Sequence, residues 1–199
     1  MDVYKRKRDF AKTSEPKPER VRSRGPLKFV VQKHRATALH YDFRLEAGGT
    51  LRSWAVPKGP SLDPKQRRLA MEVEDHPLEY ASFEGIIPEG EYGGGTVMIW
   101  DEGMWAPMED VDPAKALDSG EIRFLLDGKK LKGSFTLVRT GDRKWLLMKR
   151  KDEYASARDI AALEPRSVRT KRLLAEIAKD EGGDVKKAAT GDPAPRRRG

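Results

Sequence analysis

The three histidines of this chain all lie between positions 34 and 76. Two of them begin the stretch His34-Arg-Ala-Thr-Ala-Leu-His40-Tyr-Asp42-Phe-Arg44, which combines imidazole, carboxylate and guanidinium groups. Imidazole and carboxylate ligands without thiolate suit Mn²⁺, Zn²⁺ or Fe²⁺. A guanidinium group beside them can bind a phosphate oxygen. The stretch therefore predicts a combined metal and phosphate site, although spacing alone leaves open which histidines are ligands.

The residues from Leu39 to Leu45 alternate strictly between apolar and polar side chains. This is the period of a half-buried β-strand, in which successive side chains point to opposite faces. One face is then expected to pack into a core. The other face presents His40, Asp42 and Arg44 together, so that two candidate ligands and an anion holder share one surface.

A second run, from position 68 to position 76, repeats this arrangement. Its apolar residues alternate with polar residues of the opposite parity, which are Arg68, Glu72, Glu74 and His76. Between the two runs, prolines and a glycine stiffen a turn that presents Lys58. Tyr80 follows His76 by four positions and is expected to reach the same rim.

Together these residues predict the hydrolysis of a phosphate ester. A metal ion surrounded by Arg44, Arg68 and Lys58 would bind a phosphate and neutralise the charge that grows on its oxygens. Glu74 or the remaining histidine is then available for proton transfer.

Two alternatives from other classes of protein stay open at this point. The spacing His40-x-Asp42 followed by His76 also fits the two-histidine, one-carboxylate triad of non-haem iron oxygenases, although three converging cations favour a phosphate. The second alternative is a barrel that binds nucleic acid without catalysis. It would use aromatic side chains as stacking platforms, for which the candidates are Trp54, Tyr80, Tyr92, Trp100 and Trp105.

The charge balance favours a polyanionic partner such as nucleic acid. The chain has 199 residues, with 40 Lys and Arg against 32 Asp and Glu, and its net charge is +8. Cysteine is absent, which excludes disulfide bonds and thiolate zinc sites. Since no apolar run is long enough for a signal peptide or a membrane span, we expect no membrane partner and a cytoplasmic location, associated with the nucleoid in a prokaryote.

The pattern along the chain predicts four parts. Residues 1–26 are basic and poor in apolar side chains, and we expect them to form an arm laid on the domain or on a ligand. Residues 27–155 contain short alternating runs separated by Gly, Pro and Asp. A helical extension is expected over 156–179, and a disordered basic tail over 180–199.

The domain over 27–155 is predicted to be all-β. Eight strands in this length favour a small closed eight-stranded β-barrel with short helices and flexible basic termini, whose interior is filled by side chains. We place the strands near 28–33, 39–46, 51–56, 68–74, 96–100, 121–126, 133–139 and 144–150.

Several motifs resemble the 3′-phosphoesterase module of bacterial DNA ligase D. The resemblance covers about residues 4–155, and its motifs are Phe29-Val-Val-Gln-Lys-His34 through Arg44, Trp54–Pro60, Glu74–Tyr80, Phe83–Gly93 and Ile99–Gly103. It implies an eight-stranded barrel that trims 3′ ends during non-homologous end joining. Such a module removes a terminal ribonucleotide by phosphodiester cleavage and then the exposed 3′-phosphate, which leaves a 3′-hydroxyl.

Position by position, the resemblance also implies the roles of individual residues. Manganese, or another divalent transition metal, would be bound by His34, His40 and Asp42. Six further positions would contact phosphate or take part in catalysis, namely Arg44, Lys58, Arg68, Glu74, His76 and Tyr80; of these, Arg44, Lys58, Arg68 and His76 would bind the phosphate. All nine positions hold the residue that the family pattern expects.

The resemblance implies partners as well. They are DNA or RNA-tipped DNA 3′ ends, together with a DNA ligase or polymerase and Ku-type end-joining proteins. In ligase D the module is usually fused to ligase and polymerase domains. This chain contains no Lys-x-Asp-Gly adenylation motif, so we expect a stand-alone phosphoesterase or an excised module.

Overall fold

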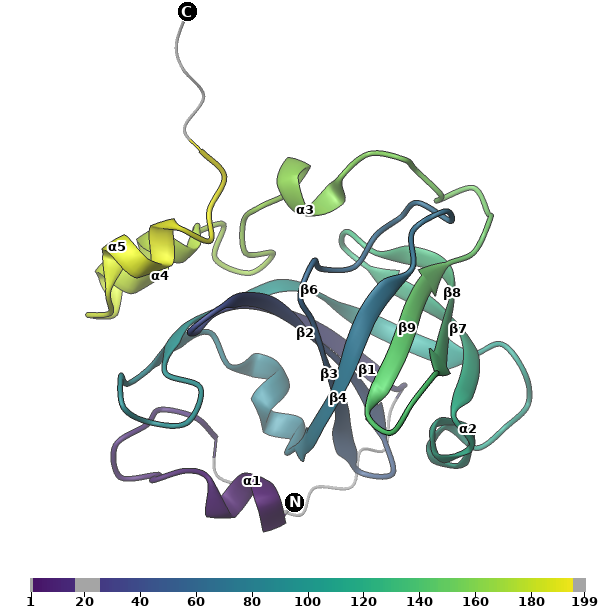
Figure 1. Ribbon diagram of the computed structural model, residues 1–199, viewed down its shortest axis with the longest axis horizontal. Helices are drawn as coiled ribbons and strands as arrows, with labels where there is room; N and C mark the ends of the chain where they lie inside the picture. Colours follow the sequence, from purple (N-terminus) through teal and green to yellow (C-terminus); the bar gives the residue numbers. More distant parts are fainter. Residues whose placement is uncertain (1, 17–25, 195–199) are drawn as a thin grey trace, which may run out of the picture.

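The computed structural model describes residues 2–16 and 26–194, and a closed β-barrel forms most of it (Figure 1). Eight antiparallel strands follow one another in the order β1-β2-β3-β4-β9-β8-β7-β6, and β6 pairs with β1 to close the barrel. The strands are β1 (Lys28–Arg35), β2 (Leu39–Ala47), β3 (Thr50–Val56), β4 (Arg68–His76), β6 (Gly95–Pro107), β7 (Glu121–Gly128), β8 (Lys132–Arg139) and β9 (Lys144–Lys149). The predicted eight-stranded barrel is confirmed, and every predicted strand has its counterpart.

The remaining elements are short. A further strand, β5 (Gly85–Ile87), pairs with the start of β6 outside the closed circle. The helices are α1 (Asp2–Arg6), the 3-10 helix η1 (Leu78–Ser82), α2 (Pro113–Ser119), α3 (Ile160–Leu163), α4 (Leu174–Asp180) and α5 (Val185–Ala189). Within 2–16 and 26–194, no helix has the length and apolar character that crossing a bilayer requires.

Large aromatic side chains fill the barrel interior, as predicted. Trp54, Trp100 and Trp145 are fully buried, and the rings of Trp54 and Trp145 pack edge to face with their centroids 5.6 Å apart. Trp105 is buried as well. Because the interior is occupied, a ligand must bind on an outer face of the barrel. The three tryptophans named as stacking candidates are therefore core residues.

A β-bulge in β4 changes which of its side chains face outward. Across the β3–β4 pair, Ser53 lies opposite Val73, whereas Leu51 lies opposite His76, so β4 carries one extra residue between these points. Before the bulge, Glu72 pairs with the buried Trp54 and faces the barrel interior. The prediction that residues 68, 72, 74 and 76 share one face is therefore wrong, since an inserted residue reverses the alternation.

The outer face of β2 is not open to solvent. Its residues from Tyr41 to Ala47 are buried on both sides of the strand. On this outer side Arg44 of β2 lies 3.0 Å from His76 of β4, and helix α1 packs against β4 from outside. The predicted half-buried strand is therefore buried on both faces, because residues near the start of the chain cover its polar side.

The segment after Asp180 is ordered, at least to position 194, so the expected disordered tail is wrong over that range. The carboxylate of Asp192 accepts hydrogen bonds from the backbone N–H groups of Leu174 and Ala175, at the start of α4. Ala188 of α5 is buried beside α4. Residues 17–25 of the predicted arm and 195–199 of the predicted tail lie outside the described residues.

Candidate active site and metal centre

Two neighbouring strands bring the candidate metal ligands together. His34 on β1 pairs directly with His40 on β2, and Asp42 follows two positions later on the same face. The Asp42 carboxylate lies 3.6 Å from His34 Nδ1 and 3.5 Å from His40 Nε2. One ligand atom from each residue lies within 4.8 Å of the others. Three donor atoms therefore lie on one side of the position that a metal ion would take. A metal site with open coordination positions requires this arrangement.

Backbone carbonyl groups fix the tautomers of both histidines. The Nε2 atom of His34 lies 2.8 Å from the carbonyl oxygen of Gly93, and His40 Nδ1 lies 3.1 Å from that of Ala38. Because a carbonyl oxygen only accepts, each of these nitrogens carries the proton. The lone pairs of His34 Nδ1 and His40 Nε2 are then directed toward Asp42. Such bonds are typical of histidines that bind metal ions, so the donor set fits a divalent transition metal.

Asp42 is held in its charged form. Burial alone would raise its pKa, but the Arg44 guanidinium and the hydrogen bonds with His34 and His40 lower the pKa well below its usual value. Burial lowers the pKa of His40, but the Asp42 carboxylate, which attracts the protonated ring and can accept a hydrogen bond from it, and the Ala38 carbonyl together raise the pKa above its usual value. A carboxylate that stays ionised is the form a metal ion requires.

Arg44 is buried next to the ligands and is fixed by three partners. Its Nε donates to Gln32 Oε1 at 2.7 Å, its Nη1 donates to Ser53 Oγ at 2.9 Å, and its Nη2 lies 3.1 Å from Asp42 Oδ2. Gln32 in turn donates to the carbonyl oxygens of residues 80 and 83, each at 2.9 Å. This network leaves little freedom to the guanidinium plane.

His76 is a neutral imidazole within this network. Its Nδ1 lies 2.9 Å from the carbonyl oxygen of Glu74 and 3.0 Å from Arg44 Nη1, and its Nε2 lies 3.3 Å from Arg8 Nη2. Because Nε2 faces a guanidinium, which only donates, we assign the lone pair to Nε2 and the proton to Nδ1, where the Glu74 carbonyl oxygen can accept it. Burial, followed by the charges of Arg44 and Arg8, lowers the pKa of His76 well below its usual value.

Tyr80 stands beside His76 with its hydroxyl protonated. The two rings meet edge to face with centroids 4.7 Å apart. Burial, followed by the charge of Glu15, raises the pKa of Tyr80 well above its usual value. At neutral pH this side chain can therefore donate a hydrogen bond but does not act as a base.

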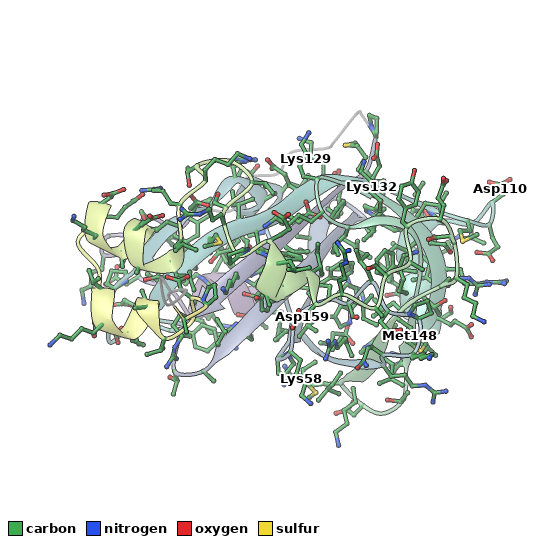
Figure 2. All side chains as sticks on the ribbon, turned by 90° about the horizontal axis from the view of Figure 1, so that it is seen from above. Lys58, Asp110, Lys129, Lys132, Met148 and Asp159 are labelled. Atoms are coloured by element: carbon green, nitrogen blue, oxygen red, sulfur yellow. The ribbon has the colours of Figure 1, made fainter. Side chains whose placement is uncertain are left out.

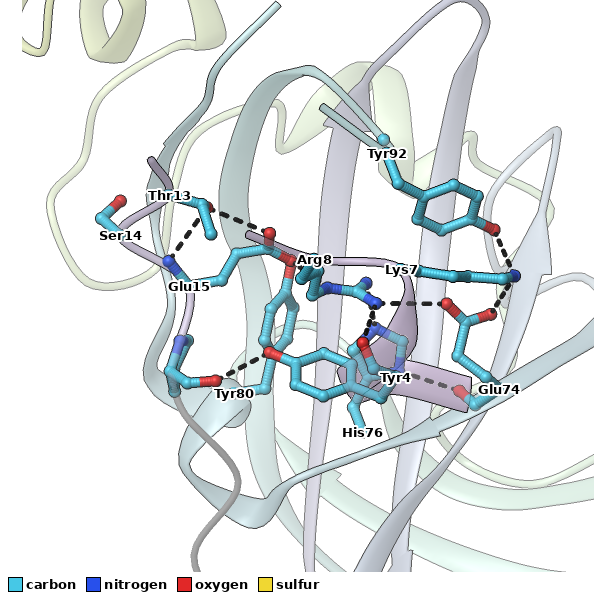
Figure 3. A network of polar contacts seen from close by, with 12 residues as sticks. Tyr4, Lys7, Arg8, Thr13, Ser14, Glu15, Glu74, His76, Tyr80 and Tyr92 are labelled. Carbon is cyan, nitrogen blue, oxygen red and sulfur yellow. Dashed lines mark hydrogen bonds and ion pairs between the residues drawn. The ribbon is translucent and has the colours of Figure 1, made fainter. Parts of the chain in front are cut away.

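The segment near the start of the chain completes the site (Figure 3). Arg8 is buried, and its guanidinium contacts Glu15 at 2.7 Å and Glu74 at 3.4 Å besides His76. The ring of Tyr4 is fully buried, with its centroid 5.0 Å from that of His76. The predicted arm therefore lies on the domain and adds a second buried guanidinium to the site.

One cavity of about 230 Å³ joins these groups. Arg8 and Tyr92 line it, together with seven of the nine predicted site residues, which are His34, His40, Asp42, Arg44, Glu74, His76 and Tyr80. The ligand group that comes together is His34, His40 and Asp42, so the combination of His40, Asp42 and His76 predicted for an oxygenase is not the one assembled.

Lys58 and Arg68 do not line this cavity. Lys58 is exposed in the loop after β3, at the edge of the molecule (Figure 2). Arg68 lies before the bulge and pairs with the buried Leu147, so it faces the interior side of β4. Its Nε is buried without a hydrogen-bond partner among the described residues. The predicted contact of these two cations with a phosphate stays a prediction.

Sequence reasoning missed several residues of the site, which are Tyr4, Arg8, Glu15 and Gln32. Gln32 has the parity of His34 on the same strand, so the two side chains share a face. The sequence of β1 does not alternate between apolar and polar residues, and the pattern that identified Asp42 therefore gave no signal for Gln32. Arg8 gave no such signal, because many basic residues surround it in the sequence.

Comparison with known proteins adds independent findings. The model of the DNA ligase D 3′-phosphoesterase domain matches residues 32–139. A multifunctional non-homologous end joining protein LigD from Pseudomonas aeruginosa is 52% identical over 180 residues, which cover 86% of this chain and 21% of that protein. The protein of the same name from Mycolicibacterium smegmatis is 42% identical over 159 residues, covering 77% of this chain and 21% of the relative.

A third relative has the same character. The multifunctional non-homologous end joining DNA repair protein LigD from Mycobacterium tuberculosis is 44% identical over 151 residues, or 75% of this chain and 20% of the relative. The chain therefore spans about a fifth of the length of the relatives that it matches. The matched region of the domain model contains all nine predicted site residues.

Proposed function

Because this chain belongs to the DNA ligase D 3′-phosphoesterase domain family, we propose that it hydrolyses phosphate esters at the 3′ ends of DNA strands. It removes a 3′-terminal ribonucleotide by phosphodiester cleavage and then removes the exposed 3′-phosphate. The observation that carries this proposal is the position of two buried guanidinium groups beside three metal-ligand side chains in one cavity. Two fixed cations and a metal site suit an anion with several oxygens.

In this proposal His34, His40 and Asp42 hold the metal, which is Mn²⁺ or another divalent transition metal. We choose this class of metal because the donor set consists of two imidazoles and one carboxylate. When bound, Mn²⁺ would act as a Lewis acid on a phosphate oxygen.

Arg44 and Arg8 hold the phosphate in the proposed mechanism. The bonds of Arg44 to Gln32, Ser53 and Asp42 occupy part of its fork of N–H donors. The remaining N–H groups are available to phosphate oxygens, and a buried donor whose position is already fixed stabilises the charge that develops there. Arg8 approaches from the opposite side of His76, where Glu15 and Glu74 orient it.

His76 accepts the proton of the attacking water in this mechanism, through Nε2, while the bond from phosphorus to the ester oxygen breaks and the leaving oxygen takes a proton from solvent. Burial, followed by the charges of Arg44 and Arg8, lowers the pKa of the ring and keeps it neutral. A phosphate bound between the two guanidinium groups offsets their charge and raises the pKa of the ring, so that the base becomes effective only with substrate present. Tyr80, whose hydroxyl stays protonated, donates a hydrogen bond to a phosphate oxygen.

Lys58 and Arg68 lie outside the cavity at the end of the barrel where β3 ends and β4 begins. An oligonucleotide is much longer than the cavity, so its backbone is the part of the substrate that the exposed Lys58 would meet. A contact of Arg68 with the phosphate stays a prediction. We also propose that the hydroxyl end produced here serves a polymerase or a ligase during end joining. A Ku-type partner stays a prediction.

The test uses purified protein and a primer-template with one 3′-terminal ribonucleotide. With Mn²⁺ we expect loss of the terminal nucleoside followed by loss of the 3′-phosphate, and with EDTA an unchanged primer. An unchanged primer in Mn²⁺ with the DNA still bound would contradict the phosphoesterase and favour the barrel that binds nucleic acid without catalysis.

A further inference from the structure

Tyr92 differs from the other aromatic side chains near the site. It lines the same cavity as Arg44 and His76, yet 48% of its surface is exposed. The neighbouring Tyr80 is buried. Tyr92 therefore stands at the mouth of the cavity, where one end of a ring contacts the site and the rest faces solvent.

Contacts from the segment near the start of the chain fix the ring of Tyr92 (Figure 3). Lys7 Nζ donates to its hydroxyl at 3.2 Å and lies 4.3 Å from the ring centroid. The same ammonium group lies 3.6 Å from a carboxylate oxygen of Glu74, and the Arg8 guanidinium lies 5.5 Å from the ring centroid. An exposed ring held by two cations loses little further conformational entropy when a ligand binds to it.

The size of the cavity indicates what part of a substrate Tyr92 would meet. Pockets that enclose a whole small molecule typically have about 300–1,000 Å³, whereas this cavity has about 230 Å³. A phosphate held by Arg44 and Arg8 would fill its inner part. The base of the same nucleotide must then lie at the mouth, which is the position of Tyr92.

We propose that Tyr92 stacks on the nucleobase of the nucleotide whose 3′ oxygen carries the reacting phosphate. This inference rests on the proposed function. That nucleotide is present in both the diester and the monoester step, so the same contact would serve both. Stacking on an aromatic ring tolerates any base, since every base has a π-face. It suits an enzyme that must accept DNA ends of any sequence.

The experiment compares two 3′-phosphate oligonucleotides, one with a normal terminal base and one with an abasic terminal sugar. We expect Tyr92→Ala to raise KM for the normal substrate by about 5- to 150-fold, the range observed when a stacking side chain is truncated. The kcat value should change less than threefold, and Tyr92→Phe should stay close to wild type. Tyr154→Ala is the control, because Tyr154 is 44% exposed and lines a different cavity.

The abasic substrate completes a double-mutant cycle. Wild-type protein should bind it as weakly as Tyr92→Ala binds the normal substrate, and Tyr92→Ala should lose nothing further on it. Equal losses on both substrates would overturn the proposal, since Tyr92 would then act only by holding Lys7. If wild-type protein turns over neither substrate, the proposed phosphoesterase fails. Fluorescence anisotropy of the same oligonucleotides in EDTA measures binding without turnover. The same comparison of proteins and substrates therefore still tests the stacking proposal.

Discussion

The guanidinium of Arg8 lies 3.3 Å from Nε2 of His76, although 68 positions separate the two residues in the chain. Arg8 also contacts Glu15 of its own segment and Glu74 beside His76. The segment near the start of the chain therefore supplies a group to the candidate active site rather than only covering it.

We expect Arg8→Ala to lower kcat/KM on a 3′-phosphate oligonucleotide by about 10²- to 10³-fold, the usual cost of removing one fixed donor to a developing charge. Arg8→Lys should recover only part of the loss, because an ammonium group cannot reproduce the planar fork. Initial rates at several substrate concentrations measure the effect. Lys12→Ala is the control, since Lys12 is exposed and, within residues 2–16 and 26–194, its ammonium group pairs only with Asp9. Equal rates for Arg8→Ala and Lys12→Ala would contradict a role in the site.

The second prediction concerns the metal centre. Asp42→Asn keeps the size of the side chain but removes the charge between His34 and His40, and we expect Mn²⁺ affinity to fall by more than about 100-fold, beyond the effect typical of residues that only orient ligands. His40→Ala should bind no Mn²⁺ and show no turnover. Titration with Mn²⁺, followed by the electron paramagnetic resonance signal of the free ion, measures the affinity.

Asp110→Asn is the matched control for the metal experiment, because Asp110 is exposed in the loop between β6 and α2 (Figure 2). It should bind Mn²⁺ as the wild type does. Retained turnover in His40→Ala would show that the ligand assignment is wrong.

The third prediction is a pH dependence of stability caused by His76. Burial, Arg44 and Arg8 lower the pKa of its ring in the folded protein, and the smaller effect of Asp42 acts in the opposite direction. In the unfolded chain the pKa is about 6.5. Below that pH the unfolded state binds a proton that the folded state does not, so the free energy of unfolding falls as the pH falls.

The slope from this one group is at most about 1.4 kcal/mol per pH unit. Tyr4 and Tyr80, which also pack on the ring, have raised pKa values and do not titrate in this range. Urea unfolding of wild type and His76→Gln between pH 4.5 and 7.5 measures the difference. The stability of the wild type relative to the variant should decline below about pH 6.5. A difference that does not change with pH would contradict the neutral state of His76.

The fourth prediction concerns the hairpin between β7 and β8. The buried carboxylate of Asp101 accepts hydrogen bonds from the backbone N–H groups of Lys129, Lys130 and Leu131, at 2.8–3.1 Å. Asp101→Ala leaves these donors without their partner, and we expect a loss of about 2–4 kcal/mol in the free energy of unfolding. Urea denaturation measures it. Asp127→Ala, at an exposed position of the same hairpin, should cost less than about 0.5 kcal/mol.

The alternation of apolar and polar residues correctly predicts which side chains share a face in β2 but not in β4. Strict alternation from Leu39 to Leu45 places His40, Asp42 and Arg44 on one face, because an uninterrupted strand has a side-chain period of two. The alternation in β4 failed, since the bulge before His76 reverses the faces and leaves Arg68 on the interior side. A bulge of one residue cannot be recognised from the pattern of apolar and polar residues alone.

Contacts between distant parts of the chain account for the remaining differences between the sequence-based predictions and the structure. The composition of residues 1–26 predicts too few apolar side chains for a core, which is correct for the segment alone. Tyr4 and Arg8 are nevertheless buried, because the barrel supplies the surface that they pack on. The ordered segment after Asp180 depends in the same way on Asp192, which binds the backbone of α4.

The closure of the barrel has a consequence for the order in which the protein can be assembled during synthesis. Strand β1, which carries His34, needs β6 as its second neighbour, and the proton on His34 Nε2 needs the carbonyl oxygen of Gly93. A nascent chain that has reached Tyr80 already contains every ligand, but it lacks the strand that holds the first of them in place. We therefore expect metal binding at the proposed site to follow the emergence of β6 from the ribosome, since a polypeptide that stops before β6 has the candidate ligands without the arrangement that holds His34.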